Sequence, residues 1–278
     1  MQNKIGIMQG RLSKPIEKQI QAFPTNNWEN EFQIAEKIGF EVIEYVFDSL
    51  DNPIMNEEGI DEILNTLDKT NVKINSLCAD YFMKNLLFKI DEEEIRKNFD
   101  ILKYIIQQCS KLGIRIIELP FVDSSSLIPN NNIDEIFLRL KNIIPQLEKF
   151  NICLALETDL HYTQFVELLE KFNHPLVRAN YDIGNSTYKG YDPIEEIKNL
   201  KKFIVNIHIK DRILGGTTVT LGKGDVDFNS FFEMLSQIEY SGDLIIQGAR
   251  EDLSESKKDH LQTCSEYLNF VRKFTEKY

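Results

Sequence analysis

The chain has 278 residues, of which 42% are hydrophobic and 27% charged, and its formal net charge is −12. This composition is typical of a soluble protein, and the length suits one α/β domain, so we assign residues 1–278 to a single domain. The acidic excess argues against nucleic-acid binding, because phosphate neutralisation needs a concentrated basic surface. No apolar run is long enough to span a membrane, no signal peptide precedes the first strand pattern, and the cysteines form no CxxC pair. We therefore expect a cytoplasmic protein with neither a membrane nor a nucleic-acid partner.

Strand and helix patterns alternate from the start of the chain. Gly39 and Gly113 follow helical patterns as C-terminal caps, and Asp91 precedes one as an N-cap. Pro120 is expected to end a strand and Pro145 to kink a helix. In the first half, strands are predicted at 4–9, 42–47, 72–78 and 114–119, and helices at 28–38, 57–69, 92–112 and 133–150.

The same alternation continues in the second half. Strands are predicted at 152–158, 176–182, 203–210 and 244–247, and helices at 163–172, 193–200, 228–238 and 255–277. Strict alternation with apolar strands indicates a parallel sheet covered by helices. Eight such units favour a single (β/α)8 TIM barrel over a doubly wound sheet, and no GxGxxG fingerprint follows the first strand.

Four of the later strands end in a side chain that can bind a metal. These are Glu157, Asp182, His208 and Gln247. Period-two alternation puts Glu157 on the small-residue face of its strand and His208 on the face shared with Lys210, so both should point into the barrel. Active sites of such barrels lie at the C-terminal ends of the strands. We therefore predict one metal site there.

The predicted ligands are two carboxylates, an imidazole and an amide oxygen. Such a mostly hard, oxygen-rich set favours Mn²⁺, with Mg²⁺, Co²⁺ or Zn²⁺ as alternatives, and disfavours a thiolate-type zinc site.

These residues carry a family resemblance. The chain resembles the sugar (phosphate) isomerase/epimerase branch of the xylose isomerase-like barrel superfamily. The resemblance extends over nearly the whole chain. Its carriers are Leu156-Glu157, Asp182-Ile183-Gly184-Asn185, His208-Ile209-Lys210-Asp211 and Leu221-Gly222-Lys223-Gly224-Asp225.

The resemblance implies that Glu157, Asp182 and His208 are metal ligands and that two glutamates flank the substrate as acid and base. Two positions depart from the family's pattern. Gln247 stands where the family has a second Glu, and an amide ligates a hard cation but exchanges no proton near neutral pH. Asn185 stands where the family often has His, and we assign it to substrate binding.

The implied chemistry is proton abstraction next to a carbonyl, with the metal stabilising the enediolate. Glu157 is the expected base. Lys210, Glu118 and Asp211 are candidates for returning the proton, and we select Lys210 as the second catalytic residue. With a base on one face only, aldose–ketose isomerisation fits better than epimerisation.

The predicted substrate is a small sugar or sugar phosphate. Polar and basic groups follow several strands and could recognise a phosphate or a sugar carboxylate. Glu44, inside the second strand, is expected to brace the barrel interior with a basic partner, and His161 to cap the next helix. The residues assigned to substrate binding are Gln9, Arg11, Asn185, Asp211, Arg212, Thr217 and Arg250.

Two other functions remain open at this point. A dehydratase begins with the same proton abstraction, and a non-catalytic sugar-binding barrel is compatible with Gln247. An abasic-site endonuclease needs a histidine-rich zinc cluster, and the chain holds four histidines, of which His174 and His260 lie away from strand ends. A homodimer and a homotetramer stay open as assemblies.

Overall fold

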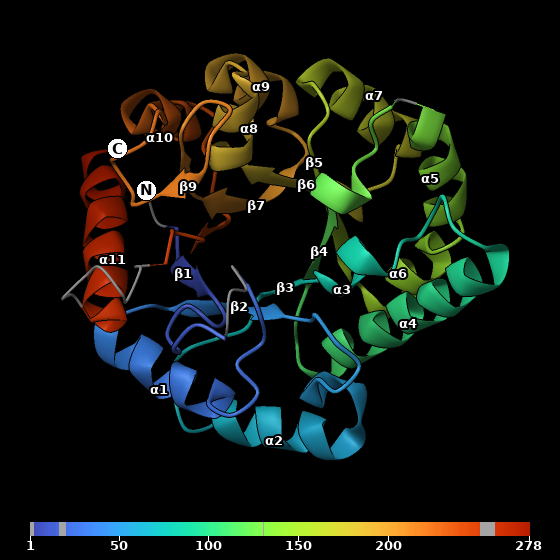
Figure 1. Cartoon of the computed structure of the whole chain (residues 1–278), viewed down its shortest axis with the longest axis horizontal. Coiled ribbons are helices and arrows are strands. Elements are labelled where there is room, and N and C mark those ends of the chain that lie inside the picture. The colour runs from blue at the N-terminus through green and yellow to red at the C-terminus, as the bar shows by residue number, and fades with distance from the viewer. Residues whose placement is uncertain (1–2, 17–20, 130, 251–258) are drawn as a thin grey trace.

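A ring of parallel strands surrounded by helices forms the centre of the protein (Figure 1). The structure, a computed structural model, describes residues 3–16, 21–129, 131–250 and 259–278. The barrel is closed, in the order β1-β10-β7-β6-β5-β4-β3-β2, and every neighbouring pair is parallel. The predicted (β/α)8 barrel is therefore confirmed. The barrel strands are β1 (Ile5–Met8), β2 (Val42–Val46), β3 (Ser76–Cys78), β4 (Ile116–Phe121), β5 (Cys153–Thr158), β6 (Val177–Asp182), β7 (Ile204–Ile209) and β10 (Asp243–Ile246).

The helices pack their apolar faces on the outside of this ring. Gly39 has a positive φ of 104° at the end of α1, and the Asp91 side chain caps α4, as predicted. His161 likewise caps α7. The helices are α1 (Trp28–Ile38), α2 (Glu57–Leu67), α3 (Tyr81–Lys84), α4 (Glu92–Lys111), α5 (Asn131–Lys141), α6 (Ile144–Phe150), α7 (Tyr162–Phe172), α8 (Ile183–Lys189), α9 (Pro193–Leu200), α10 (Phe228–Gln237) and α11 (His260–Lys277), with 3-10 turns η1 (Pro53–Met55) and η2 (Asp123–Ser125).

Two observed element boundaries differ from the predicted ones, each for a physical reason. Strand β4 continues through Pro120 to Phe121, because the ladder of β3 ends at the Cys78–Glu118 pair and no bond on that side requires the missing N–H of Pro120. The helix predicted at 133–150 is two helices, and Pro145 lies in the first turn of the second one.

Two further boundaries concern the ends of elements. The first half of the strand predicted at 72–78 makes only an isolated bridge, from Lys73 to Val42. Positions 255–258 of the last predicted helix lie outside the described residues.

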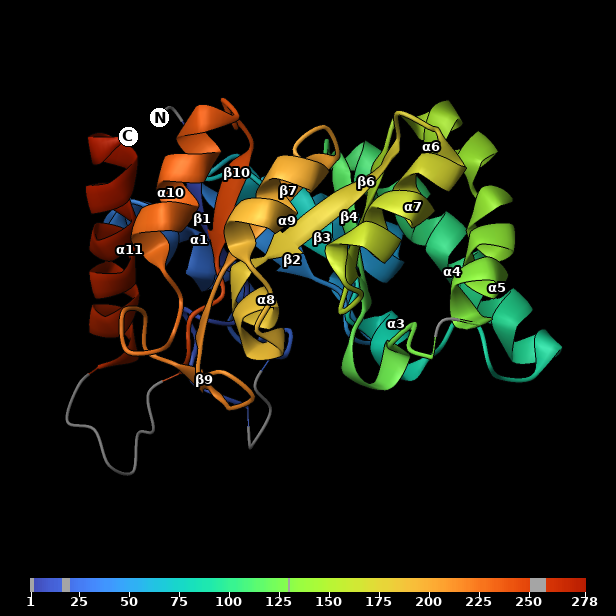
Figure 2. The ribbon, with the colours of Figure 1, turned by 90° about the horizontal axis from the view of Figure 1, so that it is seen from above.

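Short elements gather at the C-terminal end of the barrel. Figure 2 shows α3, α8 and the β9 hairpin strand on the same side of the ring, opposite to the C-terminus. The hairpin pairs β8 (Asp211–Arg212) with β9 (Thr218–Val219). These insertions surround the mouth of the barrel and so define what can reach its interior.

No helix in the described ranges is both long enough and apolar enough to cross a bilayer.

Candidate functional site

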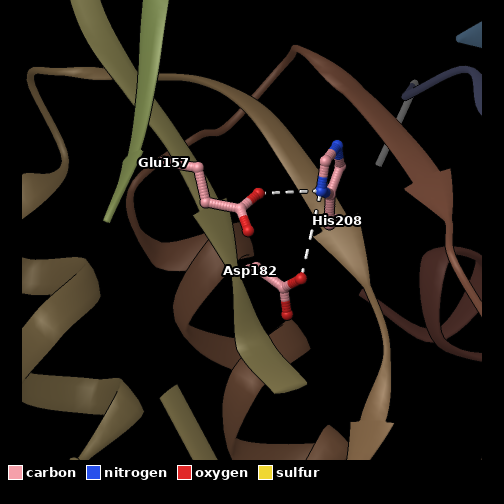
Figure 3. Close-up of side chains that lie close together, drawn as sticks. All are labelled: Glu157, Asp182 and His208. Atoms are coloured by element: carbon pink, nitrogen blue, oxygen red, sulfur yellow. Dashed lines mark ion pairs between the residues drawn. The ribbon is translucent and has the colours of Figure 1, made fainter. Parts of the chain in front are cut away.

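Glu157, Asp182 and His208 meet inside the mouth of the barrel (Figure 3). One potential ligand atom from each lies within 4.8 Å of the others. The His208 Nδ1 atom is 3.0 Å from Glu157 Oε2 and 3.9 Å from Asp182 Oδ2. All three residues are buried. The predicted strand-end cluster is therefore present for these three residues.

Strand geometry brings these three side chains together. They stand on β5, β6 and β7, which are neighbours in the barrel, and Asp182 pairs directly with His208. On β5, Leu154 and Leu156 pack outward in the core, so period-two alternation turns Glu157 inward. Asp182 also caps α8 by accepting a hydrogen bond from Asn185 N at 2.9 Å, which fixes its carboxylate at the strand end.

Two side-chain amides fix the Glu157 carboxylate. Asn180 Nδ2 donates to Glu157 Oε2 at 2.5 Å, and Asn185 Nδ2 donates to Oε1 at 2.8 Å. Asn185 is itself held, because its Oδ1 accepts a bond of 3.0 Å from Arg212 Nη1. Hydrogen bonds to both oxygens restrict rotation of the carboxylate and fix its orientation.

Glu44 orients the His208 ring from the opposite side. Its Oε1 lies 2.6 Å from His208 Nε2, and its Oε2 accepts bonds from Ser76 and Asn206. Burial alone would raise the pKa of Glu44, but the charge of His208 lowers it below its ordinary value. Burial alone would lower the pKa of His208, but the charges and hydrogen bonds of Glu44 and Glu157 raise it well above the ordinary value. The predicted brace is confirmed, and its basic partner is His208.

The donor set fits a divalent cation. With Nε2 bound to Glu44, His208 directs Nδ1 at the two carboxylates, which is the carboxylate–histidine arrangement of many metal sites. Gln247 lines the same cavity, and its Oε1 is buried without a hydrogen-bond partner among the described residues. An amide oxygen left without a partner is costly unless something else binds it. Gln21 holds the amide, since Gln247 Nε2 donates to its Oε1 at 2.9 Å.

A Glu44→Gln variant is expected to bind Mn²⁺ about 10–100-fold more weakly, which is the usual effect of losing a partner behind a metal-binding histidine. The amide removes the charge that sets the His208 ring while keeping the size of the side chain. Titration calorimetry measures the affinity, and circular dichroism checks the fold. Unchanged affinity in a folded variant would show that Glu44 has no such role.

An open cavity leads from this cluster to the protein surface. Glu157, His208 and Gln247 line it together with Lys210, whose Nζ lies 2.7 Å from Asp182 Oδ2. Five basic side chains also line it, although the protein as a whole is acidic. They are Arg11, Lys14, Lys84, Arg212 and Arg250.

The predicted substrate residues fall into two groups. Asn185, Thr217 and the three arginines Arg11, Arg212 and Arg250 line the cavity. Gln9 and Asp211 are not among its lining residues. Gln9 Oε1 accepts from Val46 N and ties β1 to β2. Asp211 is fully buried, and its carboxylate accepts backbone N–H groups of residues 222–224 and 226, so it organises the loop that follows β9.

Four further carboxyl groups line the cavity, those of Asp48, Asp80, Glu118 and Asp123. Glu118 on β4 is 1% exposed, and within the described ranges the Cys78 thiol is the only hydrogen-bond partner of its oxygens. Burial, followed by the negative charge of Glu157, raises the pKa of Glu118 well above its ordinary value. Asp80, next to the end of β3, accepts hydrogen bonds from Gln21 and Cys78, and burial raises its pKa. Sequence reasoning did not single out Asp80 or Gln21.

Relatives of the chain are found by sequence. It is 28% identical over 257 residues to L-ribulose-5-phosphate 3-epimerase UlaE of Escherichia coli O1:K1 / APEC, a match covering 88% of this chain and 89% of that protein. The match to UlaE of Escherichia coli O17:K52:H18 is 27% identical over 262 residues, with the same coverage of 88% and 89%.

Solved structures share the fold. An IOLI protein with a bound zinc atom has a TM-score of 0.78 at 18% identity, with 98% of this chain and 99% of that chain covered. D-psicose 3-epimerase from Clostridium cellulolyticum H10, solved with D-tagatose, has a TM-score of 0.76 at 15% identity, with 98% and 99% covered. The family described as "Xylose isomerase-like TIM barrel" matches residues 32–265. The chain therefore belongs to the xylose isomerase-like TIM barrel family.

Proposed function

We propose that the protein is a divalent-metal-dependent isomerase or epimerase of a sugar or sugar phosphate. The observation that carries this proposal is the buried cluster of Glu157, Asp182 and His208, which opens on a cavity lined by arginine and lysine side chains as well as by carboxyl groups. The names of its relatives support the same class, since the UlaE proteins are L-ribulose-5-phosphate 3-epimerases. The reaction type is proton abstraction from a carbon next to a carbonyl.

Glu157 acts as the base. Its carboxylate is held at both oxygens by Asn180 and Asn185, so it meets the substrate in one orientation. It takes the α-proton, and the electron pair of the broken C–H bond passes into the enediolate of the substrate. A divalent ion held by Glu157, Asp182, His208 and Gln247 supplies Lewis-acid stabilisation of the oxygen charge when it is bound, with Mn²⁺ as the metal we expect.

Lys210 supplies positive charge beside this base. Its ammonium pairs with Asp182 at 2.7 Å and lines the cavity. A donor in this position orients a substrate oxygen and moves a proton to or from it. We do not assign proton donation to Asp211, because its carboxylate accepts hydrogen bonds from backbone N–H groups of the following loop.

The substrate we propose is a ketose phosphate. Phosphate binding needs local positive charge, and the rim concentrates Arg11, Arg212 and Arg250 in a protein of net charge −12. Thr217 adds a hydroxyl at the same rim. The L-ribulose-5-phosphate named for the UlaE relatives carries such a group.

An Arg250→Gln variant is expected to raise the KM for L-ribulose 5-phosphate about 10–100-fold relative to the KM for unphosphorylated L-ribulose, since a charge-assisted hydrogen bond contributes about 1.5–3 kcal/mol. The Arg250 guanidinium also donates to Gly10 O and Ser13 O, so the variant changes the loop after β1 as well. The ratio of the two KM values cancels this shared effect. Equal changes for both sugars would place the phosphate elsewhere.

Product analysis tests the proposed function. The Mn²⁺-loaded protein, incubated with L-ribulose 5-phosphate and other ketose phosphates, should form an epimer or an aldose that nuclear magnetic resonance identifies. Loss of water with a new enone absorbance would instead establish a dehydratase. Saturable binding of these sugars without turnover would establish a sugar-binding barrel.

A further inference from the structure

Epimerisation, one of the two proposed reactions, needs a second group that exchanges a proton. Inversion at a carbon requires one group that takes a proton and another that gives one. Gln247 cannot be that group, because its amide has no proton to exchange near neutral pH. The cavity therefore has to supply the second group from another strand.

Glu118 is placed to fill this role. It stands on β4, next to β5, and pairs with Ala155, whereas Pro120 pairs with Glu157. Glu118 thus lies one inward-facing position, about 6.6 Å, deeper along the strands than Glu157. The carboxyl groups of Glu118 and Glu157 therefore lie at different depths in the barrel. Glu118 is 1% exposed, lines the cavity and, apart from the Cys78 thiol beside it, has no hydrogen-bond partner among the described residues.

Two other titratable groups near the metal-binding cluster are already engaged. Asp80 accepts from the Gln21 amide and the Cys78 thiol. Lys210 forms an ion pair with Asp182. A buried carboxyl whose oxygens accept no backbone or amide hydrogen bond is costly to stability, so its presence in the cavity wall calls for a role that hydrogen bonding within the fold does not provide.

We infer that Glu118 is the second acid–base residue of the cavity, which gives a proton to the carbon from which Glu157 takes one. This inference rests on the proposed function. Glu157 takes the α-proton and the C–H electron pair forms the enediolate. The O–H bond of Glu118 then breaks, its proton forms the new C–H bond with the enediolate electron pair, and Glu118 is left as a carboxylate. Proton exchange with water resets both carboxyl groups.

A Glu118→Gln variant separates the two half-reactions. In deuterated water with Mn²⁺ and L-ribulose 5-phosphate, the variant should still incorporate deuterium into the recovered substrate, because Glu157 is intact. Formation of the C3 epimer should fall by about 10²–10⁴-fold, the usual contribution of one acid–base group. Mn²⁺ affinity should stay within a few-fold of the natural protein, and the thermal midpoint should stay equal or rise, since the isosteric change removes a buried carboxyl that accepts no backbone or amide hydrogen bond.

Two further variants complete the test. Glu118→Gln combined with Gln247→Glu should recover part of the epimer formation, because it returns a carboxyl to the cavity wall. Glu196→Gln is the matched control. Glu196 is a buried carboxyl on α9 that accepts hydrogen bonds from the hydroxyls of Tyr181 and Ser186. It does not line the cavity, so its replacement should leave epimer formation unchanged.

Near-normal epimer formation by Glu118→Gln would overturn the inference and leave the proposed function intact. Absence of exchange in the natural protein would overturn the proposed function, and the inference with it. If Glu118→Gln does not fold, Glu118→Asp carries the test, with a measurable loss of epimer formation expected and normal epimer formation contradicting the role.

Discussion

A Glu157→Gln variant is expected to lose about 10³–10⁴-fold in kcat/KM, at the upper end of what removal of a general base costs. The change removes the proton acceptor and also one of the two carboxylates that face His208 Nδ1. Gln is close to Glu in size, so the cavity keeps its shape. Steady-state kinetics with a ketose phosphate at saturating Mn²⁺ measures the effect.

Glu167→Gln on α7 is the matched control for Glu157→Gln. Glu167 is exposed and lies in α7, the helix that follows β5, so the same chemical change there should leave kcat/KM unaltered. A Glu157→Gln protein that keeps its thermal midpoint and retains more than a tenth of the activity would show that another residue is the base.

Mn²⁺ is expected to raise the thermal midpoint by about 5–10 °C when it is present at about 100 times its dissociation constant. Binding to the native state alone stabilises it by about 2.7 kcal/mol at that concentration, and a chain of this size gains about 2–4 °C per kcal/mol. An Asp182→Asn variant should lose most of this shift, because Asn keeps the helix cap on α8 but not the negative charge. Calorimetric melting with and without Mn²⁺ measures both effects.

Asp227→Asn provides the control for this experiment. Asp227 caps α10 as Asp182 caps α8, and it lies outside the cavity lining. Its variant should show the full Mn²⁺ shift. A shift of the same size in Asp182→Asn, or none in the natural protein, would contradict the metal site.

The inward-facing cluster of Glu157, Asp182 and His208 could be predicted because strand alternation is a rigid geometric rule. Glu157 and His208 each follow an alternating run, and consecutive parallel strands bring their C-terminal ends to one rim. The same alternation, which turns His208 and Lys210 inward, places Asp211 on the other face. There it binds loop amides rather than facing the cavity. The substrate role predicted for Asp211 rested on its position just after a strand, and the strand period does not support it.

The hydrogen-bond network around these three residues could not be predicted in the same way. Asn180 and Asn206 lie within predicted strands, but only the closed barrel shows that they join Glu157 to Glu44 across strands that are far apart in sequence. Gln21 lies in an irregular loop with no periodic pattern, and its contact with Gln247 joins residues 226 positions apart. Contacts of this kind depend on how the strands close, which local patterns do not encode.

The central claim is that Glu157 removes a proton from the carbon next to a carbonyl. The most direct measurement is incorporation of solvent deuterium into L-ribulose 5-phosphate incubated with the Mn²⁺-loaded protein in deuterated water, followed by nuclear magnetic resonance. We predict deuterium next to the C2 carbonyl in the natural protein, at C1 for an isomerase or at C3 for an epimerase, and none above background in Glu157→Gln. Exchange that persists unchanged in Glu157→Gln, or that is absent from the natural protein with every ketose phosphate tested, would contradict this account.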